Sequence, residues 1–256
     1  MIVTASTSCI PDEPLVEILD QLVNLEYTAA ELVIGTPGVI LPTEIEEKHE
    51  SVVQIRKSLR RIVPIAIYFD VDTPPDDPND SQYIEYVKCF TQACQLAKEC
   101  KVAVITIHAA PLGTSFNGEV DRLKELVKIG IHHGVVVGVM TEIGRLTDTP
   151  ETALSLCKFV KGLGITLDPS QYIYGCQKQK DYKPILPYVC HVRLRDSSQE
   201  HFQTRVGQGI VDFGRLVDLL KNEQYQRGLC VDIVPVPNID QWGELRKMRL
   251  LLECTL

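Results

Sequence analysis

The sequence predicts an α/β fold, a single (β/α)8 (TIM) barrel that forms one domain over residues 1–256. Short runs rich in β-branched residues alternate with segments whose apolar residues recur at helical spacing, which indicates eight strand–helix units. The length of 256 residues suits one barrel of this kind. The alternative is an open doubly wound sheet, which usually carries a glycine-rich phosphate turn after its first strand. No such turn follows residues 2–6.

The expected strands come in order along the chain, at 2–6, 30–35, 64–70, 102–108, 135–142, 164–168, 190–196 and 228–234. Between them, the clearest helical spacing of apolar residues lies in residues 44–62, 81–100 and 120–134. Thr149 before Pro150, and Asp212 before Phe213, predict two further helix starts, because their side chains can cap free backbone N–H groups. No linker or low-complexity segment divides the chain.

Composition limits the class of partner. A net charge of −8 argues against nucleic acid, because phosphate neutralisation needs a basic surface. No apolar run reaches the roughly 18 residues of a membrane span, and the first residues lack the pattern of a signal peptide. Nine scattered cysteines without a C-x-x-C motif favour reduced thiols over disulfides. The sequence thus predicts a cytoplasmic protein with a small polar substrate and leaves homo-oligomerisation open.

Strand parity sorts the side chains into two faces. Ile105 and Ile107 would face the helices, so Thr106 and His108 would point into the barrel. The same reasoning turns charged residues inward from six strands: Glu31, Asp70, Glu142, Asp168 and Asp232 against Arg193 and Arg195. Barrels of this kind keep their active sites at the C-terminal mouth. Because buried charges need partners, this carboxylate excess predicts a pocket holding a cation, a protonated carboxyl or water.

Each of these residues also has a plain structural interpretation. A strand-end aspartate such as Asp70 or Asp168 often only caps the next helix, and a lone His108 is more often a satisfied core histidine than a ligand. The convergence of seven charged groups from six strands favours a functional pocket over these separate explanations.

The C-terminal third carries the most specific family resemblance. "HVRLRDSS", "VGQGIVDFGRLVDLL" and "GLCVDI" resemble the seventh strand, the following loop and the eighth strand of the xylose isomerase-like barrel family. The loop is carried by Gly207, Gln208, Gly209, Asp212 and Phe213. "AAELVIG", "GVMTEIG" and "GITLDPSQ" resemble the family's strands 2, 5 and 6. The resemblance covers nearly the whole chain, and the family includes sugar isomerases and epimerases, inosose dehydratases and endonuclease IV.

The resemblance implies a divalent metal held by Glu, Asp, His and Glu on strands 5 to 8. Glu142 and Asp168 match the first two positions, whereas Arg193 replaces the histidine, Asp232 the second glutamate, and Gln171 the histidine of D-x-x-H. Two cofactor states stay open. In the first, Glu142, Asp168 and Asp232 bind Mn²⁺ or Mg²⁺, which oxygen ligands favour over Zn²⁺. In the second, no metal binds, and the Arg193 guanidinium, which has no lone pair for a metal, supplies the positive charge.

Two hypotheses of function follow. The first is an isomerase, epimerase or lyase that transfers a proton next to a carbonyl of a sugar, polyol or sugar acid, with Glu142 and Asp232 as base and acid. Its expected substrate-binding residues are Glu31, His108, Gln171, His191, Arg193 and Arg205, the last on a loop expected to fold over the pocket. The second is a non-catalytic or metal-independent small-molecule-binding barrel.

An endonuclease IV-like zinc phosphodiesterase is the least favoured alternative. That kind of site needs many histidines around three metals, and this chain has six histidines, most of them in expected surface segments. The acidic composition also opposes binding to DNA.

Overall fold

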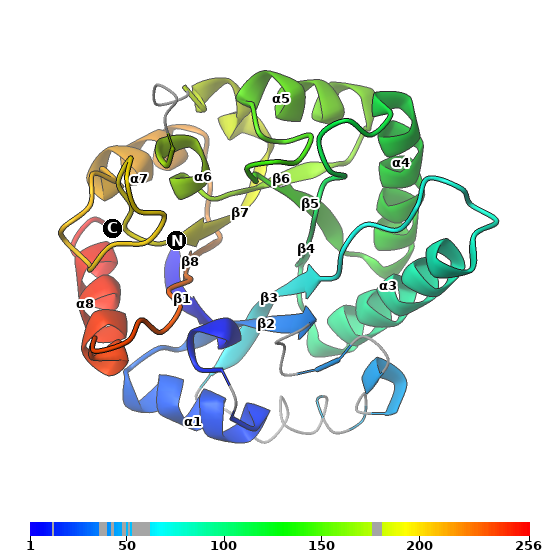
Figure 1. Cartoon of the computed structure of the whole chain (residues 1–256). Helices are drawn as coiled ribbons and strands as arrows, with labels where there is room; N and C mark the ends of the chain where they lie inside the picture. The colour runs from blue at the N-terminus through cyan, green and yellow to red at the C-terminus, as the bar shows by residue number, and fades with distance from the viewer. Residues whose placement is uncertain are drawn as a thin grey trace.

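The computed structural model describes residues 1–11, 13–35, 40–41, 44–47, 50, 52, 62–175 and 181–256. The expected helix at 44–62 falls largely outside these residues. Eight parallel strands follow one another around a closed barrel, and the first pairs with the eighth. Figure 1 looks along the barrel, with the strands in the centre and the helices around them. The predicted (β/α)8 TIM barrel is therefore confirmed.

The strands lie close to their expected positions. They are β1 (Ile2–Ser6), β2 (Ala29–Gly35), β3 (Val63–Asp70), β4 (Val104–Ile107), β5 (Val136–Met140), β6 (Gly164–Leu167), β7 (Val189–Leu194) and β8 (Gly228–Val231). Several end one to three residues earlier than expected. Glu142, Asp168, Arg195 and Asp232 therefore stand just beyond the last residue of their strands, at the mouth.

The helices of the described residues form the outer layer. They are α1 (Leu15–Asn24), α3 (Ser81–Cys100), α4 (Phe116–His133), α5 (Pro150–Phe159), α6 (Ser170–Ile173), α7 (Phe213–Asn222) and α8 (Gln241–Glu253), with short 3-10 turns η1 (Thr7–Cys9) and η3 (Lys183–Tyr188). The Thr149 and Asp212 side chains accept bonds from the backbone N–H groups of Thr152 and Arg215, which confirms both predicted helix starts. None of the described helices is long and apolar enough to cross a membrane.

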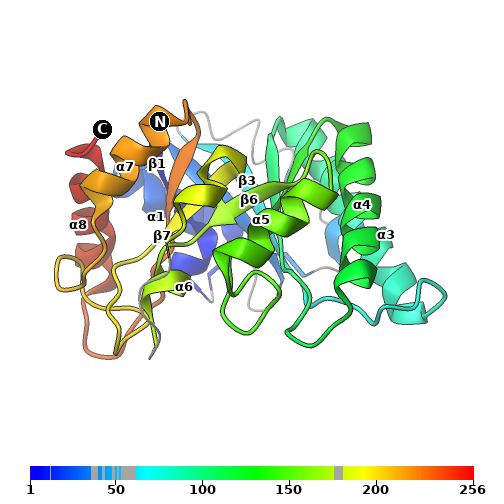
Figure 2. The ribbon, with the colours of Figure 1, turned by 90° about the horizontal axis from the view of Figure 1, so that it is seen from above.

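The expected parity of the strands holds inside the barrel. Ile105 and Ile107 are fully buried in the apolar core, while Thr106 Oγ1 lies 2.7 Å from Thr166 Oγ1. A Cβ on Gly138 would lie 2.7 Å from that Thr166 oxygen, so the narrow interior leaves no room for a side chain there. In Figure 2 the connections that follow the strands gather along the lower edge, which is the C-terminal mouth.

Candidate active site

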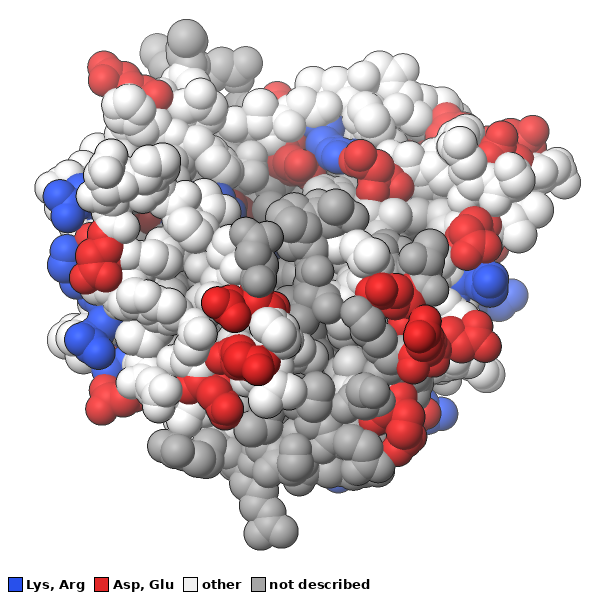
Figure 3. Space-filling view, turned by 60° about the horizontal axis from the view of Figure 1, so that its bottom comes forward, with Lys and Arg blue, Asp and Glu red and all other residues white. Residues whose placement is uncertain are grey.

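Charged side chains meet at the C-terminal ends of the strands in two neighbouring groups. The inner cluster is buried and comprises Glu31, Asp168, His191, Arg193, Arg195 and Asp232. The outer cluster reaches solvent and comprises Asp70, His108, Glu142 and Arg145. In Figure 3 acidic side chains are scattered over the visible face and most basic ones lie near its edges.

Arg193 on β7 is the centre of the inner cluster. Its Nε lies 3.2 Å from Glu31 Oε1, and its Nη2 lies 3.0 Å from Asp232 Oδ1. Its guanidinium carbon stands 4.0 Å from the centroid of the Tyr68 ring. Burial raises the pKa of Glu31, but Arg193 and then His191 outweigh burial, so the pKa is lowered overall. Glu31 is therefore an ionised partner of Arg193.

Arg195 adds a second guanidinium to the same carboxylates. It forms an ion pair with Asp232, and its Nη2 lies 3.4 Å from Asp168 Oδ2. Burial raises the pKa of Asp232, but Arg193 and Arg195 outweigh it, so this pKa is lowered overall. Burial prevails at Asp168 and raises its pKa despite Arg195. Asp232 is thus held ionised, and protonation is easier at Asp168 than at an ordinary aspartate.

His108 lies between two carboxylates of the outer cluster. Its Nδ1 is 2.7 Å from Glu142 Oε2, and its Nε2 is 2.8 Å from Asp70 Oδ1. Burial lowers the pKa of His108, yet the hydrogen bonds with Asp70 and Glu142 outweigh it and raise the pKa overall. An imidazolium that donates from both nitrogens fits this geometry. The side chains of Asp70 and Glu142 are 30% and 22% exposed, so a ligand in the mouth can approach them.

Arg145 fixes the loop after β5 to the ends of β3 and β4. Its Nε lies 3.1 Å from Glu142 Oε2, its Nη2 2.7 Å from Asp72 Oδ1, and its Nη1 donates to the Ala109 carbonyl at 3.2 Å. His108 and Arg145 both contact Oε2 of Glu142. Among the described residues, Glu142 Oε1 makes no hydrogen bond or ion pair, so this oxygen can accept a proton from a ligand.

Tyr68 joins the two clusters. Its hydroxyl oxygen lies 3.1 Å from His108 Nε2, and its ring lies under the Arg193 guanidinium. The sequence predicted one cavity shared by Glu142, Asp168, Arg193 and Asp232. The last three belong to the inner cluster, and Glu142 is linked to them through His108 and Tyr68. The shared cavity itself stays a prediction.

The residues at the metal position that the family resemblance implies do not fit a divalent metal. Arg193 and Arg195 both contact Asp232, and each is a permanent positive charge without a lone pair for a metal. Among the described residues, Glu142, Asp168 and Asp232 do not form a group whose ligand atoms all lie within 4.8 Å of one another. A dication at this position would stand beside two guanidinium groups.

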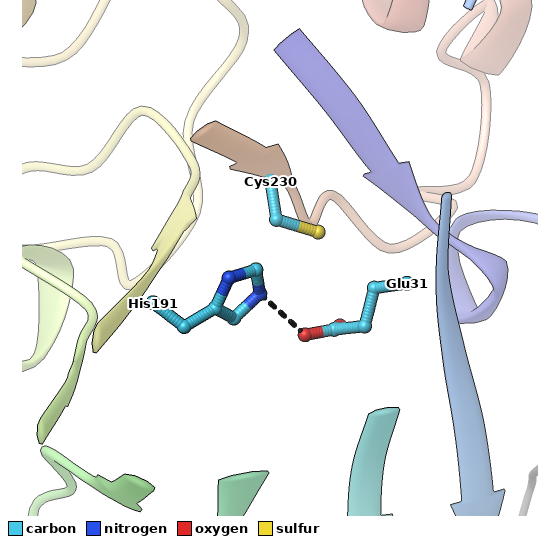
Figure 4. Close-up of side chains that lie close together, drawn as sticks. All are labelled: Glu31, His191 and Cys230. Atoms are coloured by element: carbon cyan, nitrogen blue, oxygen red, sulfur yellow. Dashed lines mark hydrogen bonds and ion pairs between the residues drawn. The ribbon is translucent and has the colours of Figure 1, made fainter. Parts of the chain in front are cut away.

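A different set of ligand atoms lies deeper in the barrel. Glu31 on β2, His191 on β7 and Cys230 on β8 are buried and offer atoms that lie within 4.8 Å of one another. Figure 4 shows the three side chains pointing toward one another inside the barrel. His191 Nε2 is 2.9 Å from Glu31 Oε2. These three residues are the described set that could hold a metal ion.

Two of the expected substrate-binding residues lie beneath the mouth. Glu31 and His191 are 0% and 1% exposed, so they support Arg193 from below. The strand rise of about 3.3 Å per residue places His191 roughly 7 Å deeper than Arg193. Gln171 lies at the mouth, where its Oε1 accepts a bond of 3.1 Å from the Ile143 backbone. It connects α6 to the loop that follows Glu142.

Asp196 organises the long loop that follows β7. Its carboxylate accepts hydrogen bonds of 2.8–3.0 Å from the backbone N–H groups of Ser197, Gly207 and Gly209. Gly207 has a φ of +85°, a conformation that favours glycine. The two glycines noted in the sequence are therefore part of the turn that brings this loop back to the end of β7.

This loop reaches the site with a different residue from the one expected. Arg205 was expected on the substrate side, but its Nε lies 3.9 Å from Glu244 Oε1 of α8, and its side chain is 49% exposed. Phe202 instead lies against Arg195, with 4.6 Å between the ring centroid and the guanidinium carbon. Arg205 therefore lies beside α8, in the loop that the bonds to Asp196 close.

The sequence pattern assigned no role to Tyr68, Arg145 or Ser8. Tyr68 has inward parity on β3, which was the available signal for it. Arg145 and Ser8 lie on irregular segments, where parity does not apply. Ser8 Oγ nevertheless donates to Asp232 Oδ1 at 3.0 Å, so the segment after β1 also contributes to the inner cluster.

Solved structures with the same fold span the whole chain. A D-tagatose 3-epimerase-like protein is 20% identical, with a TM-score of 0.75 and coverage of 100% of this chain and 98% of that one. The 3-keto-D-glucoside 4-epimerase of E. coli is 15% identical, with a TM-score of 0.79 and 99% of both chains covered. An IOLI protein with a binding zinc atom is 15% identical, with a TM-score of 0.75 and coverage of 100% and 96%.

At these identities, the solved structures establish the fold. The comparison with curated proteins gives no match. The family model described as xylose isomerase-like TIM barrel matches residues 19–249, which is most of the chain and includes every charged residue of both clusters. The chain belongs to the xylose isomerase-like TIM barrel family.

Proposed function

We propose that this protein is an isomerase or epimerase that transfers a proton next to the carbonyl of a small sugar, polyol or sugar acid. The observation that carries the proposal is His108, held between Asp70 and Glu142 at the open mouth. It sets a protonated imidazole beside a carboxylate, the acid and base that such a reaction requires. The names of the structural relatives, which include sugar epimerases, agree with this substrate class.

Glu142 and His108 divide the proton transfer between them. Glu142 takes the proton from the carbon beside the carbonyl, and the C–H electron pair becomes the C=C bond of an enediol. The substrate carbonyl oxygen displaces Asp70 Oδ1 from His108 Nε2 and takes the proton of that nitrogen as negative charge develops on the oxygen. The raised pKa of His108 favours its protonated form for this step. Return of a proton to the neighbouring carbon yields the isomer, and return to the opposite face of the same carbon yields the epimer.

Asp232 is a poor second acid in this arrangement. Its pKa is lowered, against burial, by Arg193 and Arg195, so it holds no proton to donate near neutral pH. The proposal therefore gives the acid role expected for Asp232 to His108. Arg193 takes the place of the family's metal as the positive charge at the centre of the site, where it keeps Glu31 and Asp232 ionised.

A second candidate function is small-molecule binding without catalysis. This function is favoured by the ion pairs of Arg193 and Arg195 with buried carboxylates. Both guanidinium groups already have protein partners and are less available to stabilise a reacting substrate. For either function we propose a cytoplasmic protein of carbohydrate metabolism. We propose that it does not bind nucleic acid, in keeping with its net charge of −8.

Solvent exchange tests the catalytic proposal directly. A panel of ketoses, inososes and keto sugar acids is incubated with the protein in deuterated water containing a chelator, and proton NMR follows deuterium entry next to the carbonyl. We expect exchange with the wild type and with Glu200→Gln, a control on an exposed loop residue. Glu142→Gln should lower the rate by about 10²–10⁴-fold, the usual contribution of a general base.

The same panel separates the two candidate functions. Calorimetry measures binding of each compound to the wild type. A compound that binds but does not exchange with the wild type supports the binding barrel. Equal exchange rates for the wild type and Glu142→Gln would instead show that Glu142 is not the general base.

A further inference from the structure

Glu31, His191 and Cys230 form a compact group that the proposed proton transfer does not use. The three residues come from β2, β7 and β8 and are buried beneath Arg193. Their ligand atoms all lie within 4.8 Å of one another, and the His191 imidazole is 2.9 Å from Glu31 Oε2 (Figure 4). The group therefore has the residue types and the spacing of a metal site in an enclosed position.

Two buried oxygens at this level have no hydrogen-bond donor in the described structure. One is Glu31 Oε1, which has Arg193 Nε at 3.2 Å but not in hydrogen-bonding geometry. The other is Thr4 Oγ1, on the residue paired with Cys230 across β1 and β8. Buried polar atoms without partners are uncommon and call for a missing ligand, ion or water. Glu31 belongs to the group itself, and Thr4 is the strand partner of Cys230.

The geometry points to a buried site for a zinc-class dication, held by Cys230 Sγ, His191 Nε2 and Glu31 Oε2, with a water in the fourth position. A thiolate, an imidazole and a carboxylate are the ligands that Zn²⁺ takes in proteins, whereas Mg²⁺ and Mn²⁺ prefer oxygen ligands. Tetrahedral bonds of about 2.0–2.3 Å place ligand atoms roughly 3.5 Å apart. The Glu31–His191 contact of 2.9 Å would thus open by less than about an ångström on metal binding.

The charges balance despite the nearby guanidinium. The Cys230 thiolate and the Glu31 carboxylate together neutralise the dication, and the thiol proton leaves to solvent. Arg193 keeps its own counter-ion, because Asp232 Oδ1 lies 3.0 Å from its Nη2. Glu31 would bridge the two cations, with Oε2 on the metal and Oε1 toward Arg193. This site is distinct from the family's metal position, and it does not depend on the proposed function.

Metal content of the whole protein tests the site. The protein is produced with added zinc, purified without chelator, dialysed, and analysed by elemental mass spectrometry. We expect about one zinc per folded chain. Cys230→Ser and His191→Gln should lower the zinc affinity by more than about 100-fold, since loss of a ligand exceeds the 10–100-fold cost of losing an outer partner. Cys254→Ser, which removes an exposed thiol, and Cys157→Ser, which removes a buried one, should retain zinc.

Zinc-edge X-ray absorption on the wild type identifies the zinc ligands directly, so it tests the site even if a variant fails to fold. We expect one sulfur neighbour at about 2.3 Å and the remaining neighbours, nitrogen and oxygen, at about 2.0–2.2 Å. A wild type that retains no zinc overturns the proposal. So does bound zinc with no sulfur neighbour, or zinc retained equally by folded Cys230→Ser.

Discussion

The protonation of His108 depends on its two carboxylate partners. Burial alone would lower its pKa, but Asp70 and Glu142 accept from its two nitrogens and raise it. A histidine whose pKa is higher in the folded than in the unfolded chain stabilises the fold fully below the unfolded value of about 6.5. That contribution disappears as the pH rises through the folded pKa.

The first prediction is a pH-dependent cost of replacing His108. We expect His108→Gln to lower the free energy of unfolding more at pH 6 than at pH 9, because His108 is more fully protonated, and so paired as a cation, at the lower pH. Urea unfolding at the two pH values measures this. His201→Gln, at an exposed loop position, is the control and should show no such dependence. An equal cost of His108→Gln at both pH values would contradict the charged pairing.

Arg193 gives the second prediction at the residue scale. Arg193→Met keeps much of the side-chain volume but leaves Glu31 and Asp232 buried without this cation. We expect a loss of about 3–5 kcal/mol in the free energy of unfolding, as for one partner of a buried ion pair. The comparison is Lys124→Met, which breaks an exposed pair with Asp121 and should cost less than about 1 kcal/mol. Equal costs for the two variants would show that Arg193 is not a central counter-ion.

At the scale of elements, the loop after β7 depends on one carboxylate. Asp196 is 2% exposed and holds the backbone of Ser197, Gly207 and Gly209. Trypsin can cleave after Arg205, which lies inside this loop, so the rate of that cleavage measures how often the loop opens. We expect Asp196→Ala to speed cleavage after Arg205 and to cost about 1–3 kcal/mol for the unsatisfied backbone donors. Asp121→Ala, on the exposed face of α4, should change neither. Unchanged cleavage in Asp196→Ala would mean that other contacts hold the loop.

The strands were predictable because a single local rule governs them. Side chains alternate with a period of two, so the apolar face of β4 determines that His108 points into the barrel. The same rule placed Glu31, Arg193 and Asp232 inside. The partners inside the barrel were less predictable, because they depend on strand register and on loops. Glu142 contacts His108 across β4 and β5, and Arg205 contacts Glu244 on α8, a partner that no strand pattern indicates.

At the scale of the whole molecule, the inner cluster connects strands that are distant in sequence. Glu31 from β2, Arg193 from β7 and Asp232 after β8 meet within one ion network, and Ser8 after β1 joins it. We propose that residues 1–256 form one domain closed around this network. A single cooperative transition in urea, the same by fluorescence and by far-ultraviolet circular dichroism, is the expected behaviour.

We propose that Arg193 stands in place of the divalent metal that the family resemblance implies. Arg193→His removes the permanent charge and restores a metal ligand at the family position, beside Asp168 and Asp232. Mn²⁺ is the appropriate probe, because it prefers oxygen and imidazole ligands and does not favour the deeper thiol of Cys230.

Titration calorimetry of the wild type and Arg193→His with Mn²⁺ is therefore the most direct test. We predict no stoichiometric binding by the wild type, and a gain of at least about tenfold in affinity, or about 1.4 kcal/mol, for the folded variant. Tight stoichiometric binding of Mn²⁺ by the wild type would contradict this proposal, because it would show that Arg193 does not occupy the metal position.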